Sequence, residues 1–174
     1  MRDDLMVQQQ VINAWQHMVG VICLNQTGRK KVKKLLPSFF ERFPTAEELL
    51  ESDKETIAEM LKELGMKNVR AHRIWRMSKE YLEWDGKDAT ELFGIGKYGS
   101  DSYEIFYKNR IPDNVQDKEL KRYIREELNK NKLLFAEGNA IKYICRHSHK
   151  GGVEDIDKAI HYLEMIKERD YNAE

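Results

Sequence analysis

Hydrophobic residues recur every three or four positions along most of this 174-residue chain, which is the spacing that gathers them on one side of an α-helix. The segment QQQVINAWQHMVGVICL is typical, because Trp15, Met18 and Ile22 are predicted to share one helix face. No segment shows the alternation of apolar and polar residues that marks a half-buried strand. The pattern therefore predicts an all-α fold.

Start and stop signals divide this pattern into separate helices. Thr45 and Glu48 have the spacing of a capping box and predict one helix start. Ser52 and Glu55 repeat that spacing and predict a second start. Gly65 is expected to close the second helix with a left-handed cap. Short helices joined by tight turns are therefore expected in this part of the chain.

Length and composition limit the classes of protein that the chain can be. At 174 residues it can bury the core of one domain with a small appendage, and its 41% hydrophobic and 34% charged residues are typical of a globular protein. No run of about 18 apolar residues is present, so no membrane partner is expected. The N-terminal residues lack the apolar segment of a secretory signal. Because the formal net charge is zero, any nucleic-acid contact must rest on a local basic face.

Three glycines, Gly94, Gly96 and Gly99, interrupt the helical pattern in one short turn. A hairpin built on them reverses the chain and exposes the amide groups at the start of the next helix, where a phosphate oxygen can approach without a Cβ in the way. Ile95 is expected to plug the hairpin into the core, and Lys97 to reach the phosphate charge. A plain helix–helix turn closed by glycine fits this stretch equally well by itself.

Four stretches occur in the order found in one known family, and the first is LFGIGKYGSDSYEIF, which resembles the family's hairpin. The others are AWQHMVGVICLNQTGRKKV, LKELGMKNVRAHRIWRMSKEYL and DKELKRY. This family is the helix-hairpin-helix superfamily of DNA glycosylases, with the endonuclease III-like (HhH-GPD) fold, and the likeness is strongest to its methyl-CpG-binding thymine glycosylase branch. The resemblance implies that residues 1–130 form the glycosylase domain.

The chemistry of this family requires a carboxylate. Hydrolysis of an N-glycosidic bond builds positive charge on the sugar, which a carboxylate stabilises while it directs the attacking water. The resemblance assigns this catalytic role to Asp117, which begins a predicted helix, with Asp113 as a less favoured rival. An aspartate at a helix start is also a common cap, and this alternative stays open.

Tyr98 stands where strand-cutting members of the family carry a lysine that attacks the sugar as a Schiff-base nucleophile. A phenol cannot form that imine, so the resemblance implies a monofunctional enzyme in which Tyr98 is a catalytic-site residue lying against the flipped base. A tyrosine that merely packs beside the hairpin is the alternative.

The resemblance also assigns DNA contacts to residues outside the hairpin. Gln26 would enter the space left by the flipped base, and Met66 would wedge against the orphaned partner base. The thymine glycosylase branch has arginine at the place of Gln26, which leaves the opposite-base preference open. Val7 and Gln8 would line the base pocket, although a solvated helix face is the alternative for Gln8. The basic clusters GRKKVKK and VRAHRIWR are expected to flank the cleft.

No metal or cofactor is expected to be required. Cys23 and Cys145 are the only cysteines, so the four-cysteine iron–sulfur cluster of some superfamily members is not expected. Relatives often hold a monovalent cation at the hairpin carbonyls, and the resemblance leaves such a site open. The partner it implies is double-stranded DNA that carries a mismatched or modified pyrimidine.

Residues 131–174 resemble a small phage-encoded domain of unknown function through the pattern in GNAIKYICRHSHKGGVEDIDKAIHYLE. The segment predicts two helices joined by HSHKGG. Either a basic end contacts phosphate or the hairpin mediates self-association or binds an unknown partner; the basic residues are Lys142, Arg146, His147 and Lys150. The resemblance implies a phage or prophage origin, and hence the cytoplasm of a bacterial host or phage-infected cell.

The function implied by these features is a monofunctional DNA glycosylase that removes thymine or uracil mismatched with guanine and leaves an abasic site. Three alternatives stay open. One is excision of a modified pyrimidine such as hydroxymethyluracil, the second is a phage transferase that modifies a base in place with the same carboxylate, and the third is a non-catalytic DNA-binding module.

Overall fold

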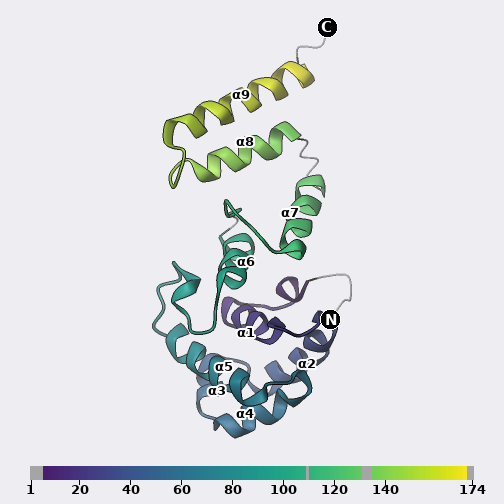
Figure 1. Ribbon diagram of the computed structural model, residues 1–174, viewed down its shortest axis with the longest axis vertical. Coiled ribbons are helices and arrows are strands. Elements are labelled where there is room, and N and C mark those ends of the chain that lie inside the picture. Colours follow the sequence, from purple (N-terminus) through teal and green to yellow (C-terminus); the bar gives the residue numbers. More distant parts are fainter. Residues whose placement is uncertain (1–5, 109, 131–134, 172–174) are drawn as a thin grey trace. The chain divides into compact units, whose positions relative to one another are not determined.

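The computed structural model describes residues 6–108, 110–130 and 135–171 (Figure 1). Over these residues every regular element is helical, which confirms the predicted all-α fold. The chain divides into two compact units, Met1–Lys108 and Asn109–Glu174. The division predicted at residue 130 rests on resemblance and stays a prediction.

The first unit contains α1 to α6 and three short 3-10 helices, coloured purple to teal in Figure 1. Their bounds are η1 Val7–Gln9, α1 Ala14–Leu24, α2 Arg29–Arg42, α3 Ala46–Leu50, α4 Lys54–Met60, η2 Lys62–Leu64, α5 Lys67–Tyr81, η3 Ala89–Glu91 and α6 Lys97–Tyr107.

The core of this unit is built around α1. Every residue from Trp15 to Cys23 is buried, and the helix packs against α2, α5, α6 and η1. The prediction of a single apolar face was therefore too narrow, because neighbours surround this helix. Trp15 Nε1 donates to Ser78 Oγ on α5 at 2.8 Å. Gly20 allows η1 to approach, since a Cβ at this position would lie 3.0 Å from Val7 Cγ1.

The two predicted capping boxes have different outcomes. The Thr45 side chain accepts a hydrogen bond from the Glu48 amide at 3.3 Å, which confirms the start of α3. The prediction of Ser52 as the next cap is wrong, because Asp53 is the N-cap of α4 and accepts from the Thr56 amide at 2.6 Å. A carboxylate is the stronger acceptor and also favours the positive end of the helix.

A buried histidine links α1 to α6. His17 has no exposed surface, and its Nε2 lies 3.0 Å from Ser102 Oγ. Burial lowers the pKa of His17 from 6.5 to about 4, because the charged ring would lose its hydration. The ring is therefore neutral in the folded protein at neutral pH.

We expect this histidine to make the protein less stable in mild acid. Between pH 6.5 and 4 the unfolded chain binds a proton that the folded chain does not, so the free energy of unfolding falls by about 2 to 3 kcal/mol as the pH drops across this window. Urea unfolding at pH 7 and pH 4.5 measures the loss. His17→Leu should remove most of it and the exposed His72→Leu should not. An equal loss in both variants would contradict this explanation.

The second unit contains α7 (Lys118–Lys130), α8 (Phe135–Arg146) and α9 (Gly152–Tyr171). Helices α8 and α9 lie side by side as a hairpin (Figure 1), which confirms the two predicted helices and the turn between them. Tyr143 and Tyr162 stack across this hairpin with ring centroids 5.8 Å apart.

An ion pair closes the turn of the hairpin. Arg146 Nε and Nη2 donate to the Asp155 carboxylate at 2.6 and 2.5 Å, and this pairing lowers the pKa of Asp155. A Cβ at Gly151 would lie 2.0 Å from Asp155 Cγ, so the absence of a side chain at this position leaves room for the carboxylate. Arg146 is thus paired inside the hairpin, and the predicted phosphate contact of this basic end stays a prediction. The predicted self-association stays a prediction.

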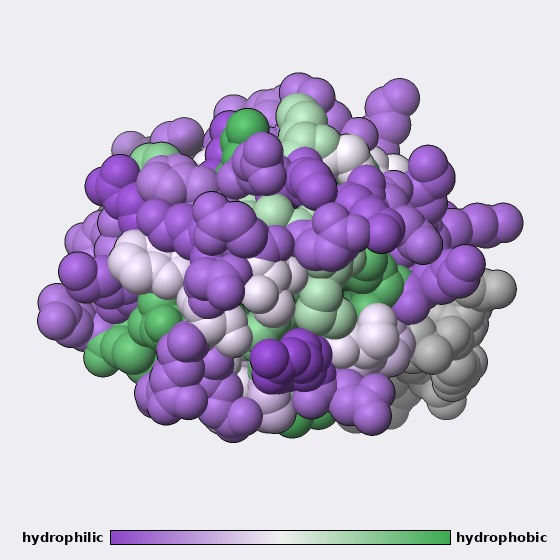
Figure 2. Space-filling view, turned by 90° about the horizontal axis from the view of Figure 1, so that it is seen from below, coloured by the Kyte–Doolittle hydropathy of each residue, from purple (hydrophilic) through white to green (hydrophobic). Residues whose placement is uncertain are grey.

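The described surface has neither a membrane-spanning helix nor, in the view of Figure 2, a broad apolar patch. In the described ranges, no helix has the length and apolar content needed to cross a membrane. The face seen in Figure 2 is mostly hydrophilic, with apolar side chains in small separate groups. No broad apolar patch covers this view.

Candidate active site

The hairpin predicted from the glycines connects η3 to α6. Gly94 has a φ of +83°, a backbone conformation that side-chain-bearing residues rarely adopt. The Ile95 amide then donates to Leu92 O at 3.0 Å and closes the turn. Ile95 is 5% exposed and lies in the hydrophobic core, which confirms that it plugs the hairpin into the core.

The other two glycines have different surroundings. A Cβ on Gly99 would lie 2.7 Å from Ile95 Cγ2 and 2.9 Å from Val21 Cγ1, so this glycine allows α6 to pack closely on α1. Gly96 is the N-cap of α6 in extended backbone, and no atom lies within 4 Å of an added Cβ. The space on the Cβ side of Gly96 is therefore open, as the approach of a phosphate to the start of α6 would need.

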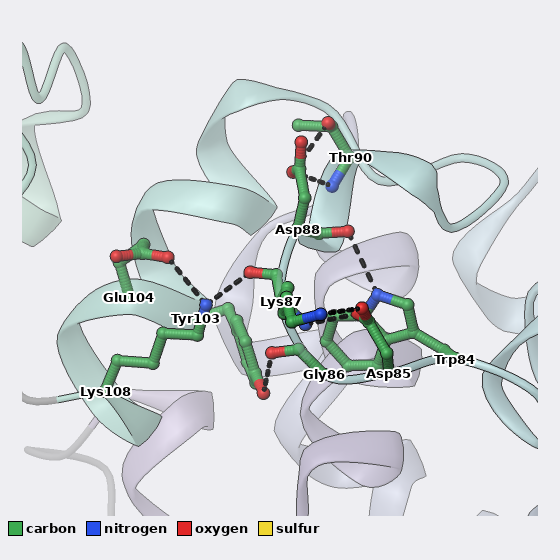
Figure 3. Close-up of polar contacts among 9 residues, drawn as sticks. All are labelled: Trp84, Asp85, Gly86, Lys87, Asp88, Thr90, Tyr103, Glu104 and Lys108. Atoms are coloured by element: carbon green, nitrogen blue, oxygen red, sulfur yellow. Dashed lines mark hydrogen bonds and ion pairs between the residues drawn. The ribbon is translucent and has the colours of Figure 1, made fainter. Parts of the chain in front are cut away.

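The loop that leads into the hairpin is tied to α6, as Figure 3 shows. Tyr103 Oη donates to Gly86 O at 3.1 Å, and Lys108 Nζ donates to Lys87 O. Asp88 caps η3 by accepting from the Thr90 amide at 2.9 Å. The bonds from Tyr103 and Lys108 hold the loop before the hairpin against α6, the helix that follows the hairpin.

Lys97 occupies the first turn of α6 beside the hairpin. Its Nζ lies 2.8 Å from both oxygens of Asp101, whose side chain is 8% exposed. The ammonium group is therefore paired along its own helix in the absence of DNA, while about half of the Lys97 side chain stays exposed.

Gln8 and Tyr98 meet although they are far apart in the sequence. Gln8 Nε2 donates to Tyr98 Oη at 2.5 Å, so that η1 and the start of α6 are joined. Gln8 is 5% exposed, which rules out the solvated face considered for it, and its Oε1 is buried without a hydrogen-bond partner among the described residues. Val7 belongs to the hydrophobic core.

Gln26 and Met66 form the tips of two exposed turns. They have φ values of 56° and 49° and are the non-glycine residues with positive φ among those that the structure describes. Gly65, predicted to close the preceding helix as a left-handed cap, has a positive φ but a ψ of 166°, outside the left-handed helical region; the residue in that region is Met66, the N-cap of α5. Such conformations cost about 1 to 3 kcal/mol for non-glycine residues and need support from their surroundings.

That support comes from Arg70, which the sequence analysis placed in a surface basic cluster. This assignment is wrong, because Arg70 is 2% exposed. The helical register contained a signal for its burial, since Arg70 precedes the buried residues Ile74 and Met77 by four and seven positions. Its guanidinium group binds oxygen atoms of both turns: the partners are the carbonyls of Ile22, Cys23, Asn25, Leu64 and Gly65 and the hydroxyl of Thr27.

Asp117 lies in the second unit at the start of α7. Its Oδ1 accepts hydrogen bonds from the amides of Glu119 and Leu120, both at 2.9 Å. The predicted helix start is therefore confirmed. Oδ2 takes part in neither bond, and the carboxylate is partly exposed. The catalytic role stays a prediction at this point.

Among the residues that the structure describes, no three His, Cys, Asp or Glu side chains gather as a metal site would require. Both cysteines are free thiols, and burial raises the pKa of Cys23 to about 12. The predicted monovalent cation at the hairpin stays a prediction.

The fold and the hairpin agree with a known family. The chain belongs to the HhH-GPD superfamily of base excision DNA repair proteins, whose family model matches residues 19–167. Its structure is similar to that of a thermostable thymine-DNA glycosylase, with a TM-score of 0.58 and 19% identity over 94% of this chain and 77% of that chain. At this identity the likeness establishes the shared fold.

Curated relatives, among them two thymine/uracil-DNA glycosylases, also match parts of this chain by sequence. The chain is 33% identical over 92 residues to a methyl-CpG-binding domain protein 4-like protein of Arabidopsis thaliana, covering 53% of this chain and 21% of that protein. It is 29% identical over 98 residues to a thymine/uracil-DNA glycosylase of Methanothermobacter thermautotrophicus, covering 48% of this chain and 44% of that enzyme. The chain thus spans less than half the length of these relatives.

Proposed function

We propose that this protein is a monofunctional DNA glycosylase that removes thymine or uracil opposite guanine from double-stranded DNA and leaves an abasic site. The related enzymes named as thymine/uracil-DNA glycosylases support the substrate class. On this proposal the hairpin binds a phosphodiester of the damaged strand, with Gly96 and Lys97 nearest to the phosphate.

The observation that carries the proposal is the contact between Gln8 and Tyr98. An amide edge with one buried atom free can pair with the polar edge of a pyrimidine, and a phenol ring can lie against its face. These two residues come from segments ninety positions apart and meet at the start of the hairpin helix. This long-range contact is the support for a base pocket beside the hairpin.

The proposed reaction is a hydrolysis that needs no cofactor. The bond between C1′ and the base nitrogen breaks, the electron pair leaves with the base, and positive charge develops on the sugar. The Asp117 carboxylate stabilises that charge and directs a water molecule, whose oxygen bonds to C1′ while its proton is lost and the base is protonated.

The absence of a lyase step follows from the residues after the hairpin. Tyr98 cannot form an imine with the sugar, and the Lys97 side chain is paired with Asp101 along its own helix. The enzyme is therefore expected to stop at the abasic site.

The proposal is tested with four duplexes of one sequence that carry G·T, G·U, G·5-hydroxymethyluracil or G·C at a single position. We expect strand cleavage of G·T and G·U only after hot alkali, and none of G·C. Cleavage without alkali would overturn the monofunctional assignment. Activity on hydroxymethyluracil alone would favour the modified-pyrimidine alternative, and binding without cleavage of any duplex would favour a DNA-binding module.

A further inference from the structure

We infer that Arg70 is a positioning residue that sets the backbone conformation of Gln26 and Met66, the two turn tips proposed to fill the gap left by the flipped base. In this way Arg70 couples the two tips to each other. This inference rests on the proposed function, because that function gives the tips their role in the vacated base pair. The hydrogen bonds from Arg70 to the two turns, called the clamp below, lie among the described residues. They depend on no property of the hairpin or of Asp117.

The guanidinium group reaches the residue before each tip. Nη2 donates to Asn25 O at 2.8 Å, directly before Gln26, and Nε donates to Gly65 O at 2.9 Å, directly before Met66. A peptide carbonyl held in this way fixes the plane of the peptide bond that joins it to the following residue, here the tip. One planar group therefore controls the backbone that leads into both left-handed tips.

Thr27 completes the link between the two turns. Its hydroxyl accepts from Arg70 Nη2 at 2.5 Å and donates to Leu64 O at 3.2 Å, so the turn after α1 is bonded to the turn before α5. Nη1 meanwhile donates to the carbonyls of Ile22 and Cys23, at 2.8 and 3.0 Å, in the last turn of α1. The clamp is thus anchored on the core helix of the unit.

The chemistry of arginine suits this task better than that of lysine. Its five N–H donors lie in one plane and point in fixed directions, and every nitrogen of Arg70 is bonded. A buried cation of this kind is retained because removing any partner would leave a polar group unsatisfied. The side chain therefore holds the two tips at a set separation without touching DNA.

The test compares binding to two duplexes of one sequence, one intact and one with a tetrahydrofuran abasic analogue opposite guanine. Wild type is expected to prefer the abasic duplex, because the tips fill the gap. Arg70→Lys should lower this preference by roughly 10-fold while binding to the intact duplex is retained, because lysine cannot bond the carbonyls before both tips at once. The exposed Arg42→Lys, in the same unit, is the matched control and should behave as wild type.

A double-mutant cycle separates positioning from general destabilisation. Met66→Ala should lower the preference in the wild type and change little in the Arg70→Lys background, because the tip is already misplaced there. Additive effects, or an Arg70→Lys protein that keeps the preference, would overturn the inference. A wild type without any preference would overturn it as well.

Two further measurements keep the result interpretable. If Arg70→Lys does not fold, Thr27→Val removes the bridging hydroxyl with little change of shape and should lower the preference in the same direction; full retention would overturn the inference. Base excision is measured on the same proteins. If the wild type excises no base but its preference for the abasic duplex depends on Arg70, the proposed function is contradicted and the clamp is still supported.

Discussion

Asp117→Asn is expected to lower the single-turnover rate of base excision by about 100-fold or more, as is typical when a charge-stabilising group is removed from an active site. Asparagine has nearly the same shape and is an equally good N-cap, so its side-chain oxygen can still accept from the amides of Glu119 and Leu120. The substitution therefore removes the negative charge and preserves the start of α7. Binding to a G·U duplex, followed by fluorescence anisotropy, should change little.

The neighbouring carboxylate provides the control for this experiment. Asp113 is exposed in the loop before α7, and Asp113→Asn should excise the base at the wild-type rate. An Asp117→Asn protein that binds DNA and works within about threefold of the wild type would contradict the catalytic assignment. A large loss in Asp113→Asn alone would transfer that assignment to the rival residue.

Substitutions of the hairpin glycines are expected to separate folding from DNA binding. In Gly99→Ala the new methyl group meets Ile95 and Val21 at less than 3 Å, and overpacking of this kind costs about 1 to 3 kcal/mol of stability. In Gly96→Ala the methyl group meets nothing and the backbone is already extended, so the stability should change by less than about 1 kcal/mol.

DNA affinity should be affected by the Gly96 substitution, although the stability is not. The Gly96 methyl group would occupy the open space on the Cβ side of Gly96, where the phosphate is proposed to approach the start of α6, and affinity should fall roughly 10-fold, the equivalent of one hydrogen bond to a charged group. Urea unfolding and anisotropy on both variants measure the two effects. A Gly96→Ala protein with unchanged affinity would contradict the assigned phosphate contact.

Local signals in the sequence were sufficient for the helices and for the hairpin. The three-and-four spacing gave α8 and α9 with their turn, and Ile95 was expected in the core because an apolar residue between two glycines has no other place to be buried. Predictions that needed only a residue and its near neighbours were therefore mostly confirmed. The cap at Asp53 was missed because Ser52 has a glutamate three positions later, as a capping box requires, whereas Asp53 has Thr56 there.

Contacts between distant segments could not be read from periodicity. The burial of α1 on all sides depends on four other elements, and the link from Gln8 to Tyr98 spans most of the first unit. Arg70 was assigned to the surface because charge usually indicates exposure, although its helical register matched the buried stripe. A charged residue in register with a buried stripe therefore deserves to be considered as an internal clamp.

The central claim is that this chain breaks the bond between a pyrimidine and its deoxyribose by hydrolysis. The most direct test is to incubate the wild-type protein with the G·U duplex and to identify, by liquid chromatography and mass spectrometry, what leaves the DNA. We expect free uracil in an amount equal to the abasic sites formed, with the phosphodiester backbone intact. Uracil that stays attached to the strand, unchanged or modified, while the protein binds the duplex would contradict the claim.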